Sequence, residues 1–289
     1  MADIILEIGV LNIKASPHPD GVYPNLLKRI AGKPVPMWGN DYLALTTPER
    51  NQGLHSGRVL VWTELDPNAP ALDKTKLEAV SLEDAHVAID ENIGINLRVF
   101  SYVLRERDHL IFFESKNEQG RQLAPDRLQK SLEKLFFRIN SRGDMQVDID
   151  VMPEEDALDK VLSIKRLGTL EILLKKPNPD DNDLDAAEIM RELEEQGAGR
   201  KEIKLTAKVR KKGLKPNKRT IVEAEAASEN GHVRGTGRDG ANAKVDLSTK
   251  EYPKIIHRPL ADYASAAVAV LRVAKDAVIG RRRGRAPPT

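Results

Sequence analysis

The sequence predicts an α+β fold made of two α/β-type domains with mixed sheets. Runs in which apolar and polar residues alternate predict strands, and runs with apolar residues three and four positions apart predict helices. Both kinds of run interleave along 289 residues, a length that exceeds one compact core and fits two domains. Forty per cent of the residues are apolar, which is enough to bury a core, and 31% are charged.

The first half of the chain opens on a strand pattern, because apolar residues alternate from Ile4 to Ile13. Helices are expected at Tyr23–Ile30 and at Leu123–Ile139, where apolar residues recur at helical spacing. Proline and glycine interrupt Val35–Asn40, which predicts a loop. Further strands are expected at Tyr42–Leu45, Val59–Leu65, Ile95–Leu104, His109–Glu114 and Met145–Val151, with a hairpin across Arg107-Asp108.

From Pro153 onward the predicted units become shorter. Pro153 suits the first turn of a helix, and Asn182 or Asp183 suits the cap of a second helix that ends at Gly197. A third helix runs from Pro216 to Asn230-Gly231. Strands are expected at Leu170–Leu174 and Lys201–Arg210, a hairpin at His232–Arg238 and Ala243–Leu247, and a last helix at Ala261–Gly280.

These elements predict three parts of the chain. Residues 1–152 together with 255–280 form a larger α+β domain, residues 153–254 form an α/β module, and residues 281–289 form a basic tail. The last helix has an inner face of small residues, which suits docking on its own sheet or a dimer seam. That face consists of Ala266, Ala267, Val270, Ala274 and Ala277.

Charge is sorted along the chain, although the net charge is only +2. Ten of the twenty residues from Arg200 to Arg219 are Lys or Arg, and only Glu202 is acidic. The preceding segment, Asn178–Gly197, holds eight acidic residues and a single basic one. Sorted charge of this kind is typical of a protein that presents a positive surface to a polyanion. The alternative interpretation is that these charges form a solvated polar face that binds no ligand.

The basic residues predict contact with nucleic-acid phosphates. No aromatic residue lies within 200–219, so base stacking is poorly supported there, and the expected partner is duplex DNA, with structured RNA second. In the strand Lys201–Arg210, Ile203, Leu205 and Val209 are expected to face the core. The candidate binding residues are Arg200, Lys201, Lys204, Lys208, Arg210, Lys211, Lys212, Lys215, Lys218, Arg219, Arg281, Arg282, Arg283 and Arg285.

Other chemistry finds little support in the sequence. The absence of cysteine excludes disulfides and thiolate sites, and it fits a cytoplasmic location. No apolar run is long enough for a membrane helix, and the histidines lack zinc-pair spacing, so neither metal nor cofactor is expected. Gly235, Gly237 and Gly240 match a dinucleotide motif, but the residues after them predict a strand where that motif needs a helix.

One set of residues predicts a different activity, a Mg²⁺-dependent nuclease. Asp108 precedes a strand that leads to Glu114 and Lys116, and two carboxylates with a lysine are how some nucleases hold the metal and polarise water. Asp148 and Asp150 on the next strand face the same way and add carboxylates or form a solvated face. A third hypothesis is a scaffold that binds an acidic protein partner through the basic residues.

Three segments resemble a known family. The run from Leu167 to Asn178, the later Glu229–Arg234 and the Ala-rich closing helix resemble a bacterial family of uncharacterised proteins. That family is distantly similar to the lambda-phage superinfection-exclusion protein RexA. The resemblance covers residues 145–280, and it implies a homodimeric, sequence-nonspecific DNA-binding protein of phage defence. It also implies a middle module hinged to a larger domain, a partner protein of a defence system, and no catalytic motif.

Overall fold

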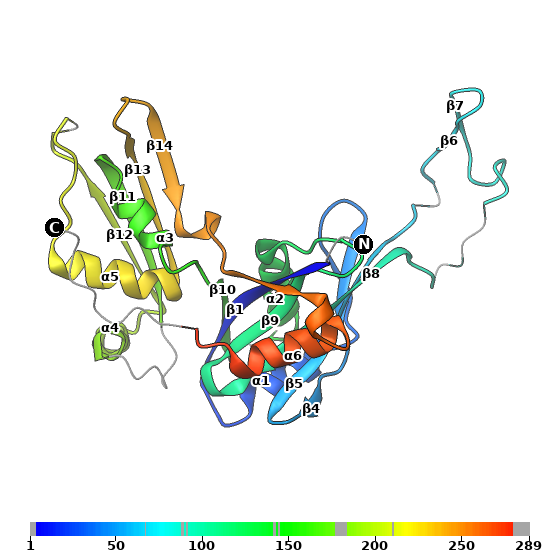
Figure 1. Cartoon of the computed structure of the whole chain (residues 1–289), viewed down its shortest axis with the longest axis horizontal. Coiled ribbons are helices and arrows are strands. Elements are labelled where there is room, and N and C mark those ends of the chain that lie inside the picture. Colours follow the sequence, from blue (N-terminus) through cyan, green and yellow to red (C-terminus); the bar gives the residue numbers. More distant parts are fainter. Residues whose placement is uncertain are drawn as a thin grey trace.

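The fold is known from a computed structural model. It describes residues 4–66, 68–87, 90, 92–140, 143, 145–176, 184–209 and 211–279. The α+β class is confirmed, with helices packed on two sheets whose strand pairs, among these residues, are all antiparallel (Figure 1). No helix in the described ranges is long and apolar enough to cross a membrane.

The larger sheet is built around the first strand, β1, as its alternating apolar residues predict. β1 pairs with β15 through its first half and with β10 through its second half, and β9 lies along its other edge. The strand order is β10-β1-β9-β8-β5-β3-β2, with β4 on β5. The strands are β1 (Ile5–Ser16), β2 (Val35–Pro36), β3 (Asp41–Leu45), β4 (Glu49–Asn51), β5 (Leu54–Thr63), β8 (Ile95–Arg105), β9 (Leu110–Lys116), β10 (Gln146–Val151) and β15 (Ile255–Pro259).

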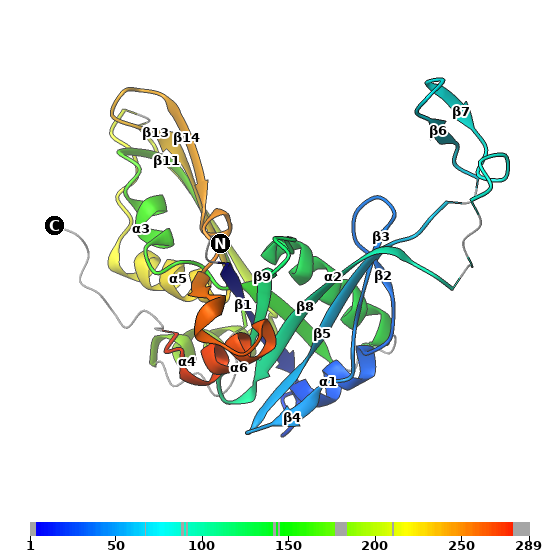
Figure 2. The same ribbon diagram turned by 45° about the vertical axis from the view of Figure 1, so that its right-hand side comes forward.

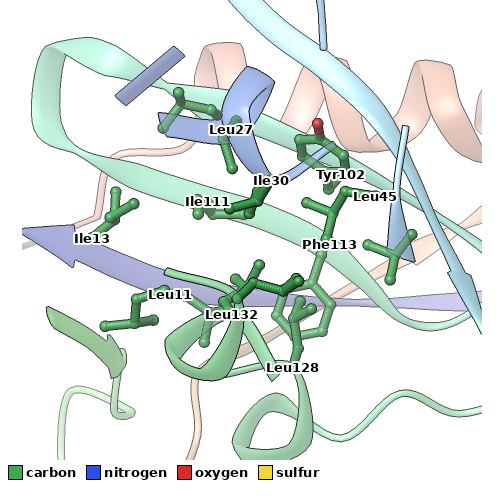
Figure 3. Close-up of a cluster of buried hydrophobic side chains, with 14 of the residues drawn as sticks. Leu11, Ile13, Leu27, Ile30, Leu45, Tyr102, Ile111, Phe113, Leu128 and Leu132 are labelled. Atoms are coloured by element: carbon green, nitrogen blue, oxygen red, sulfur yellow. The ribbon is translucent and has the colours of Figure 1, made fainter. Parts of the chain in front are cut away.

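Helices cover both faces of this sheet because β1 is apolar on both faces. Helices α1 (Val22–Ile30) and α2 (Pro125–Ile139) pack on one face, where Leu11 and Ile13 meet Leu27 and Leu132 (Figure 3). Helix α6 (Ala266–Asp276) packs on the other face against β8 and β9. The C-terminal helix therefore docks on its own sheet, and its buried face consists of Ala266, Ala269, Val270, Val273 and Ala274.

A small hairpin stands apart from both sheets. Among the described residues, strands β6 (Ala71–Asp73) and β7 (Glu78–Val80) pair only with each other, and they lie far from the body of the molecule (Figure 2). Leu72 and Leu77 on this hairpin are exposed. The hairpin therefore adds no buried apolar surface to either sheet.

The chain passes between the two sheets twice, and the two passages lie side by side. Pro153 and Pro253 form an isolated bridge, and the Lys254 amide donates to the Met152 carbonyl at 2.8 Å. Lys160 on the next helix lies over the ring of Tyr252. These contacts fix where the second sheet begins relative to the first. The domain boundaries at residues 152–153 and 254–255 stay a prediction.

The second sheet has four strands and an open face. Its order is β12-β11-β13-β14, and three helices cover one face with a core that includes Leu170, Ile172 and Val233. Mostly polar residues occupy the other face, which none of the described helices covers (Figure 1). The elements are α3 (Ala157–Leu162), β11 (Arg166–Lys175), α4 (Leu184–Glu195), β12 (Arg200–Thr206), α5 (Lys218–Glu229), β13 (Gly231–Arg238) and β14 (Lys244–Ser248).

Several element ends differ from the expectation. β12 ends at Thr206, so Lys208 lies beyond the strand and Val209, expected in the core, is 47% exposed. α6 begins only at Ala266, after Ser265, whose hydroxyl accepts from the Val268 amide and caps the helix. Ala267 is exposed instead of lying on the inner face. The segment expected as a loop at 35–40 contributes the short strand β2.

Candidate nucleic-acid interface

The basic run, Arg200–Arg219, divides into two parts by the surroundings of its cations. The cations of the first part, Arg200, Lys201, Lys204 and Arg219, lie beside carboxylates. In the first part, the Lys201 ammonium contacts the carboxylates of Glu192 at 2.8 Å and Glu223 at 3.0 Å. Arg219 contacts Glu192 at 3.3 Å. These contacts bring the acidic helix α4 and helix α5 onto β12, and both carboxylates raise the pKa of Lys201. The charge of this part is therefore balanced within the chain.

The same balance holds on the open face next to β12. The Lys204 ammonium lies 2.7 Å from the Glu171 carboxylate on β11, directly across the strand pair. Arg200 lies 3.5 Å from Glu202. Exposed pairs of this kind contribute little to stability, but each carboxylate offsets a cation that a phosphate would otherwise attract. The first part of the run is thus a poor site for a polyanion.

The second part of the run has no such partners. Within the described residues, none of its exposed lysines lies within ion-pair distance of a carboxylate. These lysines are Lys208, Lys211, Lys212, Lys215 and Lys218. Their charge is therefore available to a ligand.

The loop after β12 carries Lys208, Lys211, Lys212 and Lys215, and we call it the lysine loop. Backbone hydrogen bonds hold it against the start of β11. The Ala207 amide donates to the Gly168 carbonyl at 2.8 Å, and the Leu214 amide donates to the Leu167 carbonyl at 2.6 Å. Gly213, at a φ of 72°, lies so close to Arg166 that a Cβ there would be 3.2 Å from the Arg166 Cα. The loop therefore extends the sheet at the end remote from the larger sheet.

Three more cations line up at this end of the sheet. Arg166 on β11 is paired in register with Arg238 on β13, which is paired with Lys244 on β14. The guanidinium groups of Arg166 and Arg238 donate to the side-chain and main-chain oxygens of Asn242, each at 2.7 Å. Because these acceptors are neutral, they orient the guanidinium groups without cancelling their charge.

We call the resulting surface the basic tip. It lies where the β13–β14 turn and the loop after β12 meet the start of β11 (Figure 1). A shallow cavity of about 400 Å³ opens there on the uncovered face, beside the threonines 169, 206 and 236 that lie side by side on β11, β12 and β13. The basic tip consists of Arg166, Lys208, Lys211, Lys212, Lys215, Arg238 and Lys244.

Sequence reasoning missed three members of the basic tip. Arg166, Arg238 and Lys244 lie outside the dense basic run and join it through strand register. Five predicted binding residues, Arg210, Arg281, Arg282, Arg283 and Arg285, lie outside the described residues. The glycine motif leads into the strand β14, as expected, and Gly237 is needed because a Cβ there would lie 2.2 Å from the Arg166 carbonyl oxygen.

The candidate nuclease residues do not converge. Asp108 forms a two-point ion pair with Arg105 at one end of β9. Glu114 lies farther along β9 and accepts from the Ser101 amide, while the Lys116 ammonium lies 3.3 Å from a Glu7 carboxylate oxygen. No cluster of three potential metal ligands exists among the described residues.

Glu114 itself is a buried carboxyl. It is 3% exposed, one of its oxygens has no partner within the described part of the chain, and burial raises its pKa. The native state therefore binds more protons than the unfolded state above the ordinary pKa of 4.5, so this group costs stability as pH rises through the raised pKa.

We expect Glu114→Gln to be more stable than the parent protein by about 1 kcal/mol at pH 8. The gain should shrink towards pH 4, where the parent carboxyl is mostly protonated in both states. Urea unfolding at several pH values measures it. A nuclease role for Glu114 predicts instead that plasmid cleavage with Mg²⁺ is present in the parent protein and lost in the variant.

Asp148 and Asp150 take part in a charge cluster that joins the two sheets. The Asp150 carboxylate lies 2.5 Å from the Lys14 ammonium on β1 and 2.8 Å from the Lys175 ammonium on β11. Lys175 also contacts Asp148 at 3.6 Å. Burial lowers the pKa of Lys14. For Asp150, burial favours the neutral form, but the two lysines outweigh it and hold the pKa below its ordinary value.

One family model matches the chain, over residues 4–275, and its description is "Domain of unknown function (DUF4747)". No protein with a curated description matches the chain. The match supports the expected resemblance to an uncharacterised family, and it contains no link to RexA.

Proposed function

The chain belongs to the DUF4747 family, and from the geometry of its smaller sheet we propose that it binds duplex DNA through the basic tip, without sequence preference. One observation carries the proposal. The seven cations of the basic tip gather on one end of a sheet without a carboxylate partner among the described residues, whereas the neighbouring cations of the same run are paired.

The chemistry of the basic tip favours the phosphate backbone as its target. Lysine and arginine gain affinity by releasing the counterions condensed on phosphates, whatever the base sequence. Reading bases requires an element that enters a groove. The tip is made of loops and strand ends, and the neighbouring helices, α3 and α5, are packed on the sheet. The threonine hydroxyls beside the cations add neutral donors of the kind that contact phosphates and sugars.

The proposal includes a dimer, as the family resemblance implies. The small-residue face of α6 is buried against its own sheet, so a dimer would use another surface, for which the exposed leucines of the β6–β7 hairpin are available. The role in phage defence rests on the resemblance alone. Light scattering of the purified protein tests the dimer, and a genomic neighbourhood without phage or defence genes would count against the role.

The experiment that tests DNA binding is a salt titration. We expect the purified protein to bind a duplex of several dozen base pairs, with log affinity falling linearly against log salt concentration. If all seven cations contact phosphates, the slope should approach about −6. A duplex that is not bound at low salt, or binding that does not weaken as salt rises, would overturn the proposal.

A scaffold that binds an acidic protein would use the same cations. The DNA-binding and scaffold hypotheses predict that different molecules co-purify with the protein. DNA binding predicts an absorbance ratio at 260 and 280 nm that falls on nuclease treatment, and the scaffold predicts a co-purifying acidic protein with no nucleic acid.

A further inference from the structure

A second surface, on the larger sheet, has features that the basic tip lacks. A groove of about 780 Å³ runs along α2 beside the edge strand β10 and the segment after β2. Its volume is in the range of small-ligand sites. Two of the aromatic side chains that line this groove are exposed to solvent. Trp38 is 72% exposed and Phe137 is 84% exposed.

Exposed aromatic rings beside cations are the arrangement that binds unpaired nucleobases, because every base has a face that stacks on a ring. The Arg127 guanidinium lies 5.7 Å from the centre of the Trp38 ring. About two turns farther along α2, Lys134 donates to the Pro36 carbonyl at 3.1 Å. Within the described ranges neither cation pairs with a carboxylate, so both can attract a phosphate.

The carboxylates in the groove are offset by other groups. Asp126 lies 3.1 Å from Lys130, and Asp148 contacts Lys175. Glu133 is partly buried and accepts from the Gln129 side-chain amide at 3.2 Å, and burial raises its pKa. Arg127 and Lys134 are therefore the groove cations without a carboxylate partner among the described residues.

The groove begins where the open face of the smaller sheet ends. Lys175 is the last residue of β11, and its ammonium contacts Asp148, which also lines the groove. Gly199 before β12 lies against the side chain of Gln146, another lining residue. From Arg166 to Lys175 the strand spans roughly 30 Å, so the basic tip and the groove are the two ends of one surface.

We propose that this groove binds an unpaired base of a single-stranded nucleic acid, stacked on Trp38 or Phe137, with its phosphates at Arg127 and Lys134. The inference rests on the proposed function for its class of ligand, nucleic acid, but on a different set of residues. The protein would then bind a duplex at the tip and a single-stranded extension of that duplex in the groove.

The test uses the fluorescence of Trp38. The chain has two tryptophans, and Trp62 donates to Glu64 at 2.6 Å and stacks on Tyr42, away from the groove lining. In the full-length Trp62→Phe protein, only Trp38 reports. We expect oligothymidine of about 15 nucleotides to quench its emission with saturation, and a blunt duplex of equal length to quench it far less.

Variants separate stacking from general attraction. On the Trp62→Phe background, Phe137→Ala and Lys134→Ala should each weaken oligothymidine binding about tenfold or more. The matched control, Val268→Ala, removes an exposed apolar side chain from α6 and should change nothing. Quenching that is absent, or that both groove variants leave unchanged, would overturn the inference.

Two further outcomes distinguish the groove from the tip. If Lys211→Glu with Lys212→Glu abolishes duplex binding and leaves oligothymidine quenching intact, the groove acts as a site of its own. If duplex binding occurs without quenching, the groove inference fails while the proposed function stands. Emission that changes with protein concentration alone would show that a second copy of the chain occupies the groove, which also overturns the inference.

Discussion

Replacing Asp150 by asparagine should lower the free energy of unfolding by about 3–5 kcal/mol, the cost of breaking a buried ion pair by removing one partner. The Asp150 carboxylate lies between the ammonium groups of Lys14 and Lys175, and its side chain is 2% exposed. Asparagine keeps the shape of the side chain but leaves two cations at the junction of the sheets without their shared anion. Urea unfolding at pH 7 measures the loss.

Asp148→Asn is the matched control, because it makes the same change two residues away on the same strand. Its contact with Lys175 is longer, at 3.6 Å, and its side chain is 25% exposed, so the expected loss is below about 1 kcal/mol. The Asp150 stabilisation should also depend on pH. Since the folded pKa of Asp150 lies below the ordinary 3.8, its contribution is complete above that value and is lost as pH falls through the folded pKa. Equal losses in both variants would contradict this account.

The elements of the fold were predictable where local signals agree. Alternating residues predicted β1, and the hairpins predicted across Arg107-Asp108 and at His232–Arg238 with Ala243–Leu247 are both present in the structure. Element ends were less predictable, because tertiary contacts set them. β12 ends at Thr206, because the Ala207 amide donates to the Gly168 carbonyl where the chain turns into the lysine loop. The alternating sequence pattern alone would continue the strand to residue 210.

The sites were only partly predictable from the sequence. The lysine loop was visible as a dense run, but the pairing of Lys201 with acidic residues, which removes it from the free cations, depends on how α4 packs. From their residue type, large aromatic side chains are expected to be mostly buried, whereas Trp38 and Phe137 are exposed. Lys14 and Asp150 are 136 positions apart, so only the register of β1 and β10 brings them together.

Reversing two charges of the basic tip, Lys211→Glu together with Lys212→Glu, should weaken duplex binding by about a hundredfold or more near 0.1 M salt. Each lysine that contacts a phosphate releases about one counterion, so losing two contacts should flatten the slope of log affinity against log salt by about 2. Both side chains are exposed and lack a carboxylate partner among the described residues, so the melting temperature should stay close to that of the parent protein.

The matched control changes the net charge by the same amount elsewhere. Lys28 and Lys33 are exposed near the end of α1 on the larger sheet, and Lys28→Glu with Lys33→Glu should leave the salt slope unchanged. Long-range attraction alone would weaken binding in both double variants alike, whereas phosphate contact at the tip affects only the first. If the Lys211 and Lys212 variant binds as the parent protein does, the basic tip is not the site. The arginines at 281–285 are then the next residues to neutralise, because they carry the remaining concentrated positive charge of the sequence.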